Sequence, residues 1–252
     1  MIKMIILGSS SAIPDENHFN THLVVVAQKR MVMIDCSGTP ILRLKEVGLD
    51  YRRLTDVVLT HFHPDHVSGL PQFLMNLWLL GRKDPLSIYG LDHTIGRTEK
   101  LLDLFDWQTW PGFFPVVFHR LPEVEVNLLF ETEEIRIFSS PVRHILPTLG
   151  VRIDSVLSGR SLAYSSDTEP CPEVVRLANN TDMLIHEATG AGFGHSSAEQ
   201  AGEIARQAGT TKLMLIHYAA SNQSEAKQLV EEARFRFHGP VELAEDLMQI
   251  EF

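Results

Sequence analysis

The chain has 252 residues, of which 44% are hydrophobic and 21% are charged, and its formal net charge is −10 with the histidines neutral. This length and composition predict one globular domain over residues 1–252, and the acidic balance argues against a broad basic surface for nucleic acids. Cys36 and Cys171 lack zinc-finger spacing, and no stretch is long enough to span a bilayer, so we expect reduced thiols in a cytoplasmic protein without a membrane partner.

The first half of the chain predicts strands followed by helices. Short runs rich in β-branched residues predict strands at residues 2–8, 22–28, 30–35 and 56–61. Apolar periodicity and terminal glycines predict helices at residues 39–48, 69–82 and 95–106. The aromatic-rich stretch 101–126 has no obvious place in a core, and we expect it either to line a substrate cleft or to cap the domain.

The second half repeats this scheme. Strands are predicted at residues 134–142, 150–154, 161–167, 182–189 and 212–218, and helices at residues 197–209 and 224–237. Ser196 followed by Glu199 predicts a capping box, and Gly209 ends that helix. Two β-rich halves with helices predict an α/β protein, and two packed sheets with outer helices would form four αββα layers. Periodicity alone supports the α/β class without requiring the sandwich.

The stretch THFHPDH, residues 60–66, places three histidines and an aspartate directly after a predicted strand. Imidazole and carboxylate together suit zinc, manganese or iron better than calcium or magnesium. Further candidate ligands stand where later apolar runs stop, at His144, Asp167 and His217. For these three, position alone leaves an ordinary structural role equally open.

THFHPDH resembles the His-x-His-x-Asp-His signature of metallo-β-lactamase-fold hydrolases. Further stretches along nearly the whole chain resemble the ribonuclease Z and phosphodiesterase branch, among them ILGSSSAIP, MIDCSGT, GRKDPLSIYG, VRHILPTLGVRI, AYSSDT, LIHEATGAGFGHSSAEQAGEIARQAG and LMLIHY. The resemblance implies the four-layer αββα sandwich and a binuclear metal-dependent hydrolase. It also implies that Asp35 supports the metal site from outside the ligand set.

The same resemblance implies a role for each candidate residue. One metal ion would be bound by His61, His63 and His144, a second by Asp65, His66 and His217, and both by a bridging Asp167. Zinc is the favoured ion, with manganese or iron as alternatives, and a hydroxide shared by the two ions would attack phosphorus. His195 would give a proton to the leaving 3′-oxygen, and Glu187 would orient His195 or a ligand.

The substrate is the least determined feature of the sequence. Ribonuclease Z enzymes that process tRNA carry a protruding arm, which in the bacterial type lies between the third histidine and the bridging aspartate. The segment between His144 and Asp167 is too short for such an arm, so we expect a small phosphodiester or an RNA 3′ end. Alternatives are hydrolysis of a carboxylic ester, lactone or sulfate ester, a non-hydrolytic scaffold, or a di-iron redox protein. The last is disfavoured, because such chains usually have an acid where His63 stands.

The predicted helix at residues 69–82 is apolar over most of its surface. One face of the helix must meet the core, and the remaining apolar residues predict a contact with a second copy of the chain. We therefore expect a homodimer.

Overall fold

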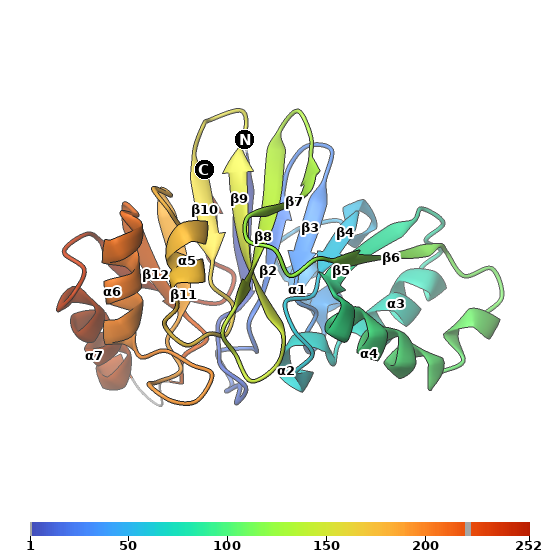
Figure 1. Cartoon of the computed structure of the whole chain (residues 1–252). Helices are drawn as coiled ribbons and strands as arrows, with labels where there is room; N and C mark the ends of the chain where they lie inside the picture. The colour runs from blue at the N-terminus through green and yellow to red at the C-terminus, as the bar shows by residue number, and fades with distance from the viewer. Residues whose placement is uncertain (1, 220–222) are drawn as a thin grey trace.

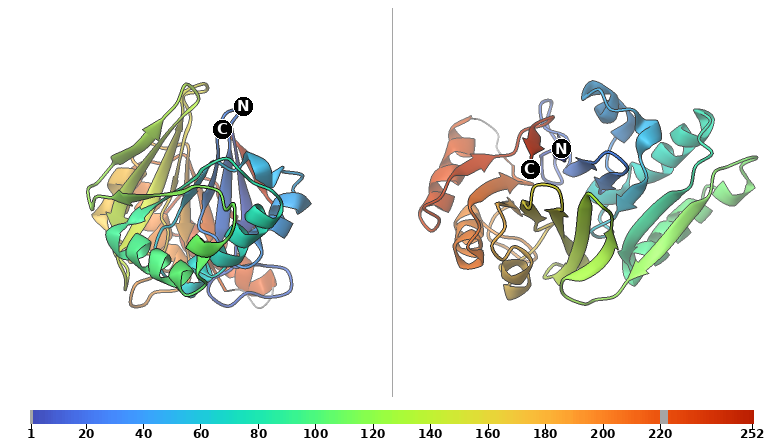
Figure 2. Two further views of the ribbon diagram at one scale, coloured as in Figure 1. Left: turned by 90° about the vertical axis from the view of Figure 1, so that its right-hand side faces the viewer. Right: turned by 90° about the horizontal axis from the view of Figure 1, so that it is seen from above.

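The computed structural model describes residues 2–219 and 223–252. In these residues, two mixed sheets of seven strands each pack face to face, and helices cover the outer side of both sheets (Figure 1). Seen from above, the helices flank the pair of sheets on both sides (Figure 2). The expected α/β class and the four-layer αββα sandwich are therefore confirmed.

The first sheet has the strand order β14-β1-β2-β3-β4-β5-β6. Its strands are β1 (Lys3–Gly8), β2 (His22–Val26), β3 (Met31–Ile34), β4 (Asp56–Val58), β5 (Leu86–Leu91), β6 (Val116–Leu121) and β14 (Gln249–Glu251). Pairing is antiparallel from β14 to β3 and parallel from β3 to β6. Parallel strands bring their carboxyl ends to one edge of a sheet, and the loop after β4 leaves from that edge.

The second sheet has the strand order β13-β12-β11-β10-β9-β8-β7. Its strands are β7 (Asn127–Glu131), β8 (Ile135–Val142), β9 (Thr148–Ser155), β10 (Ser161–Tyr164), β11 (Met183–Glu187), β12 (Lys212–Ile216) and β13 (Val241–Leu243). Pairing is antiparallel from β7 to β10 and parallel from β10 to β13. The second half therefore repeats the antiparallel-then-parallel plan of the first.

Helices from each half cover their own sheet. They are α1 (Pro40–Glu46), α2 (Pro64–Val67), α3 (Leu70–Leu79), α4 (Asp92–Asp103), α5 (Pro172–Leu177), α6 (Ala198–Ala208) and α7 (Gln223–Arg234). α1 contacts β1, and α4 contacts β5 and β6, while α5, α6 and α7 contact strands of the second sheet. No helix within the described residues is long and apolar enough to cross a membrane.

Alternation along the inner strands divides the apolar side chains between two layers. In β1, Met4 and Ile6 face the second sheet, whereas Ile5 and Leu7 face the helices. A strand that buries both faces needs an apolar residue at every position, which explains the continuous run in the sequence. Several strands buried on both sides, namely β1, β2, β3 and β12, were therefore predicted.

Several details of the prediction were wrong, and the strands β5, β6, β7, β13 and β14 were not predicted. α4 begins at Asp92 and ends at Asp103, three residues earlier than predicted at both ends. The cap of α6 is Ser197 with Gln200, because the hydroxyl of Ser196 instead donates to the carbonyl of Thr168 at 2.7 Å. Pro64 also favours a turn at the next two residues, but Asp65 and His66 belong to the short helix α2.

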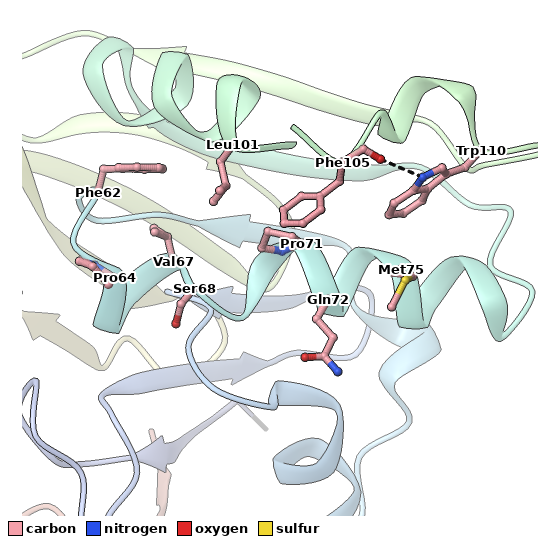
Figure 3. A pocket seen from close by; sticks show the side chains of 10 residues that line it. All are labelled: Phe62, Pro64, Val67, Ser68, Pro71, Gln72, Met75, Leu101, Phe105 and Trp110. Atoms are coloured by element: carbon pink, nitrogen blue, oxygen red, sulfur yellow. Dashed lines mark hydrogen bonds between the residues drawn. The ribbon is translucent and has the colours of Figure 1, made fainter. Parts of the chain in front are cut away.

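The aromatic stretch 101–126 separates into three parts. It contains the end of α4, a 3₁₀ turn at Trp107–Thr109 and the strand β6. The ring of Trp110 stacks on Trp78 of α3, with 5.1 Å between ring centroids. This part of the stretch therefore packs over α3, and Phe105 and Trp110 also line a groove beside it (Figure 3).

Candidate metal centre

The predicted site residues lie on loops and short helices that leave the strands at one end of the sandwich. β4 ends at Val58, and the next five residues lead to α2, which lies between the two sheets at the bottom of the view (Figure 1). His144 follows the end of β8 by two residues, and His217 comes directly after β12. Strand ends from both sheets therefore deliver their side chains to one place.

Among the described residues, three groups of possible ligand atoms form at this place, each with all of its atoms within 4.8 Å of one another; two contain Asp167, and the third consists of Glu187, His195 and His217. The first group is His61, His63, His144 and Asp167, and the second is Asp65, His66, Asp167 and His217. The structure thus brings together all seven residues that the sequence singled out as metal ligands. Asp167 belongs to both groups and is only 2% exposed.

The polar atoms at the centre of these groups are better satisfied by a divalent cation than by hydrogen bonds to one another. Nδ1 of His63 lies 3.0 Å from Nε2 of His61 and 3.1 Å from Nε2 of His144, so three ring nitrogens converge. Among the described residues, Nε2 of His66 and Oδ1 of Asp167 are buried without a hydrogen-bond partner. Buried polar atoms without a partner cost free energy, and a bound ion would remove that cost.

The protonation states of His61 and Asp167 suit metal binding. Burial lowers the pKa of the His61 ring well below its ordinary value and keeps the ring neutral. Burial opposes the charged form of Asp167, but the nearby His217 and His66 hold the pKa of this carboxyl well below its usual range. Neutral imidazole and ionised carboxylate are the forms that bind metal. Burial opposes the charged form of His66, but Asp167 and Asp35 raise the pKa of this ring well above its ordinary value, so a bound ion would displace its proton.

Asp35 and Thr60 orient two of the histidines from outside the ligand groups. The fully buried carboxylate of Asp35 accepts a hydrogen bond from Nδ1 of His66 at 2.7 Å and from the Thr60 amide at 2.8 Å. The Thr60 hydroxyl donates to Asp35 and lies 3.1 Å from Nδ1 of His61. Both rings therefore keep Nε2 free for the centre, as a carboxylate or hydroxyl partner does in metal sites.

Two more of the five histidines, His144 and His217, have partners on the loop that follows β11. Nδ1 of His144 donates to the carbonyl of Gly194 at 2.6 Å. Nδ1 of His217 lies 2.9 Å from the hydroxyl of Thr189, which also donates to the His217 carbonyl. Sequence reasoning missed Thr60, Thr189 and Gly194. Only Thr60 had a local signal, since it directly precedes His61.

Glu187 connects this loop to His195. Its carboxylate is fully buried and accepts hydrogen bonds from Nδ1 of His195 at 3.1 Å and from the amides of Thr168, Thr189 and Ser196. The hydrogen bond to Glu187 raises the pKa of His195 above its ordinary value. The His195 ring lies nearly parallel to that of His217, with 6.0 Å between centroids, and therefore borders the second ligand group.

Comparison with known proteins agrees with this geometry. A family model described as "Anti-Pycsar protein Apyc1" matches residues 2–238. A ribonuclease Z of Azobacteroides pseudotrichonymphae is 31% identical to the chain, over 90% of this chain and 91% of that protein. A ribonuclease Z of Methanothermobacter thermautotrophicus is 26% identical, over 100% of this chain and 97% of that protein.

Solved structures show the same fold. The metallo-β-lactamase fold protein YhfI from Bacillus subtilis superposes with a TM-score of 0.84 at 23% identity, covering 100% of this chain and 99% of that one. Human tRNase Z, short form, superposes with a TM-score of 0.79 at 24% identity, covering 99% of this chain and 98% of that one. The chain therefore belongs to the family described as anti-Pycsar protein Apyc1, within the ribonuclease Z-like branch of the metallo-β-lactamase-fold, metal-dependent hydrolases.

Proposed function

We propose that the chain is a binuclear metal-dependent phosphodiesterase that acts on a small phosphodiester or on an RNA 3′ end. The observation that carries this proposal is the shared position of Asp167, which lies in both groups of ligand atoms. His61, His63 and His144 would hold one ion, and Asp65, His66 and His217 the other. Zinc suits this donor set, with manganese and iron as alternatives.

The chain's own residues prepare the reaction. When bound, two divalent ions supply a water of lowered pKa and positive charge opposite the phosphate. Asp65 contributes a carboxylate whose Oδ2 lies 3.4 Å from Nε2 of both His66 and His217. Glu187 holds His195 through Nδ1, and His195 would give a proton from Nε2 to the leaving oxygen.

The connection between β8 and β10 supports a small substrate. After His144 the chain enters β9, turns and returns through β10, and both strands belong to the second sheet. The ribonuclease Z of Methanothermobacter thermautotrophicus aligns over 306 residues, more than this chain contains, so it carries segments that have no counterpart here. With a net charge of −10, a compact phosphodiester is a better match than a long polyanion.

An apolar groove beside the ligand loop favours the second candidate, hydrolysis of a carboxylic ester, lactone or sulfate ester with an apolar group. The groove has a volume of ≈ 620 Å³ and runs between α3 and α4 (Figure 3). Phe62 and Pro64, which flank His63, form one end, and Phe105 and Trp110 form the other. Aromatic side chains of this kind can pack against an apolar acyl or aryl group.

A panel of chromogenic substrates distinguishes the two candidates. We expect the zinc-loaded protein to hydrolyse bis(p-nitrophenyl) phosphate faster than a p-nitrophenyl carboxylic ester or p-nitrophenyl sulfate. Chelation should abolish turnover, and returning zinc should restore it. Asp65→Ala should lose this activity, because the second ligand group loses a carboxylate. Turnover of the carboxylic or sulfate ester alone would overturn the phosphodiesterase assignment in favour of the second candidate.

We also propose that two copies of the chain form a homodimer through the outer face of α3 and the end of α4. Leu79 and Leu104 are 66% and 79% exposed, and Leu80 and Phe105 are also exposed. Burying such a surface against a second copy would stabilise a dimer. Size-exclusion chromatography with light scattering should give a dimer at micromolar concentration and a monomer for Leu79→Asp. A wild-type monomer would refute the proposal.

We further infer a single domain in a reducing, cytoplasmic compartment. The single-domain inference is supported by one apolar layer to which both sheets contribute, for example Ile6 of β1 and Val151 of β9. The compartment is supported by two free, buried cysteines, Cys36 and Cys171.

A further inference from the structure

Glu169 lies in the turn that follows Asp167 and is connected to His144 through one glycine. Its Oε1 accepts a hydrogen bond from the amide of Gly194 at 2.9 Å. The carbonyl of the same glycine accepts the hydrogen bond from Nδ1 of His144 at 2.6 Å. The position of the His144 ring therefore depends on where Glu169 holds residue 194.

Gly194 fits this position because no side chain could replace its hydrogen. Its φ is +85°, in the left-handed region that favours glycine, and its backbone is buried. A Cβ at this position would lie 2.8 Å from Nδ1 of His144 and 2.8 Å from Cγ1 of Ile145. The backbone thus packs directly against the imidazole, and a shift of this glycine must move the ring.

The loop is fixed at its two ends, where the amides of Thr189 and Ser196 donate to Glu187. Between residues 190 and 194 the only other backbone hydrogen bonds among the described residues are internal, from the amide of Gly190 to the carbonyl of Ser196 and from the amide of His195 to the carbonyl of Gly192. Phe193, directly before Gly194, is 79% exposed. A loop of this kind has several accessible conformations unless another segment selects one.

The turn that carries Glu169 is itself fixed to the segment before His144. The amide of Glu169 donates to the carbonyl of Arg143 at 2.7 Å, and the Thr168 hydroxyl accepts from the amide of Arg143. The backbone of this turn therefore fixes the residue before His144, while the side chain of Glu169 fixes the carbonyl that the ring contacts.

We propose that Glu169 is a positioning residue, which selects the conformation of Gly194 that aims Nε2 of His144 at the first group of ligand atoms. This inference rests on the proposed function, in which His144 is a metal ligand. Groups that orient a ligating histidine typically change metal affinity by about 10–100-fold when they are removed. A merely structural role for Glu169 would lower stability and leave metal affinity unchanged.

Zinc titration of the metal-free protein against a chelating indicator tests the proposal. Glu169→Ala should weaken the binding of one of two ions by about 10–100-fold. It should also change the absorption bands of the cobalt-substituted protein, because the geometry around one ion changes. Glu169→Gln keeps an oxygen that can accept from Gly194, and its affinities should stay within about threefold of wild type. This variant also tests the proposal if Glu169→Ala does not fold.

Glu173→Ala is the matched control. Glu173 also lies close to the end of β8, with Oε2 3.6 Å from Nε of Arg143, but among the described residues the amide of Gly194 donates to Glu169 and not to Glu173. Removing it deletes a charge of the same sign from the same region, and both zinc affinities should be unchanged. Loss of affinity in Glu173→Ala or Glu169→Gln equal to that in Glu169→Ala would assign the effect to charge and overturn the proposal.

His144→Ala separates failure of this inference from failure of the proposed function. If His144→Ala loses one ion while Glu169→Ala binds both as tightly as wild type, the positioning role is wrong and the ligand set stands. If His144→Ala keeps both affinities, the ligand set is wrong and the positioning role is wrong with it. Loss of one ion in His144→Ala and weakened binding of one in Glu169→Ala is the expected result.

Discussion

Replacement of Asp167 by alanine is expected to abolish hydrolysis and to release metal from both groups of ligand atoms. Its Oδ2 lies 3.5 Å from Nε2 of His66 and 3.8 Å from Nε2 of His61, and its Oδ1 lies 3.5 Å from Nε2 of His217. Within residues 2–219 and 223–252, no other residue belongs to both four-membered groups. The loss of kcat/KM should therefore exceed the roughly 100-fold that follows from losing a partner outside the ligand set.

Metal content and turnover should be measured together, with Asp154→Ala as the control. Asp154 lies on β9 of the second sheet and pairs with Arg152 at 2.7 Å. It belongs to neither of the ligand groups that contain Asp167. That variant should retain two ions and full activity, because Asp154 belongs to none of the groups of possible ligand atoms. A folded Asp167→Ala protein that keeps two ions per chain and near-normal turnover would disprove the proposal that both ions share the Asp167 carboxylate.

How much of the candidate site could be predicted from the sequence depended on how close together its residues lie in the chain. THFHPDH was recognisable because three imidazoles and a carboxylate are crowded into one short stretch after a strand. For His144, Asp167 and His217, which lie far apart in the chain, position alone left the question open and the family resemblance was needed. Gly194 and Thr189 gave no signal, because they act through a carbonyl and a hydroxyl that only the folded chain brings to the rings.

Whether a strand could be predicted from the sequence depended mainly on how deeply it is buried. Strands buried on both faces, such as β1 and β12, read as continuous apolar runs and were predicted. β6 and β7 lie at the sheet edges and are only partly buried, so their sequences mix polar and apolar residues and were missed. β5 is mostly buried, and its run LSIYGL follows Pro85, which obscured the strand.

Replacement of His195 by alanine is expected to produce a loss of rate that depends on the leaving group. A dinucleoside monophosphate expels a sugar hydroxyl of high pKa and needs a proton in the transition state, so kcat should fall by about 10²–10⁴-fold. p-Nitrophenolate leaves without protonation, so hydrolysis of bis(p-nitrophenyl) phosphate should fall far less. Metal content should remain that of wild type, because His195 lies in neither of the two groups that contain Asp167.

Glu187→Gln and His238→Ala are the companion variants to His195→Ala. Glu187 holds Nδ1 of His195 and raises its pKa, so Glu187→Gln should lower kcat for the dinucleoside substrate in the same direction but by less. His238 is exposed, and its replacement should leave both substrates unaffected. Equal losses for both leaving groups in His195→Ala would show that His195 binds the phosphate or shapes the metal centre. A loss confined to the poor leaving group cannot come from misplaced metal, and it would identify His195 as the proton donor.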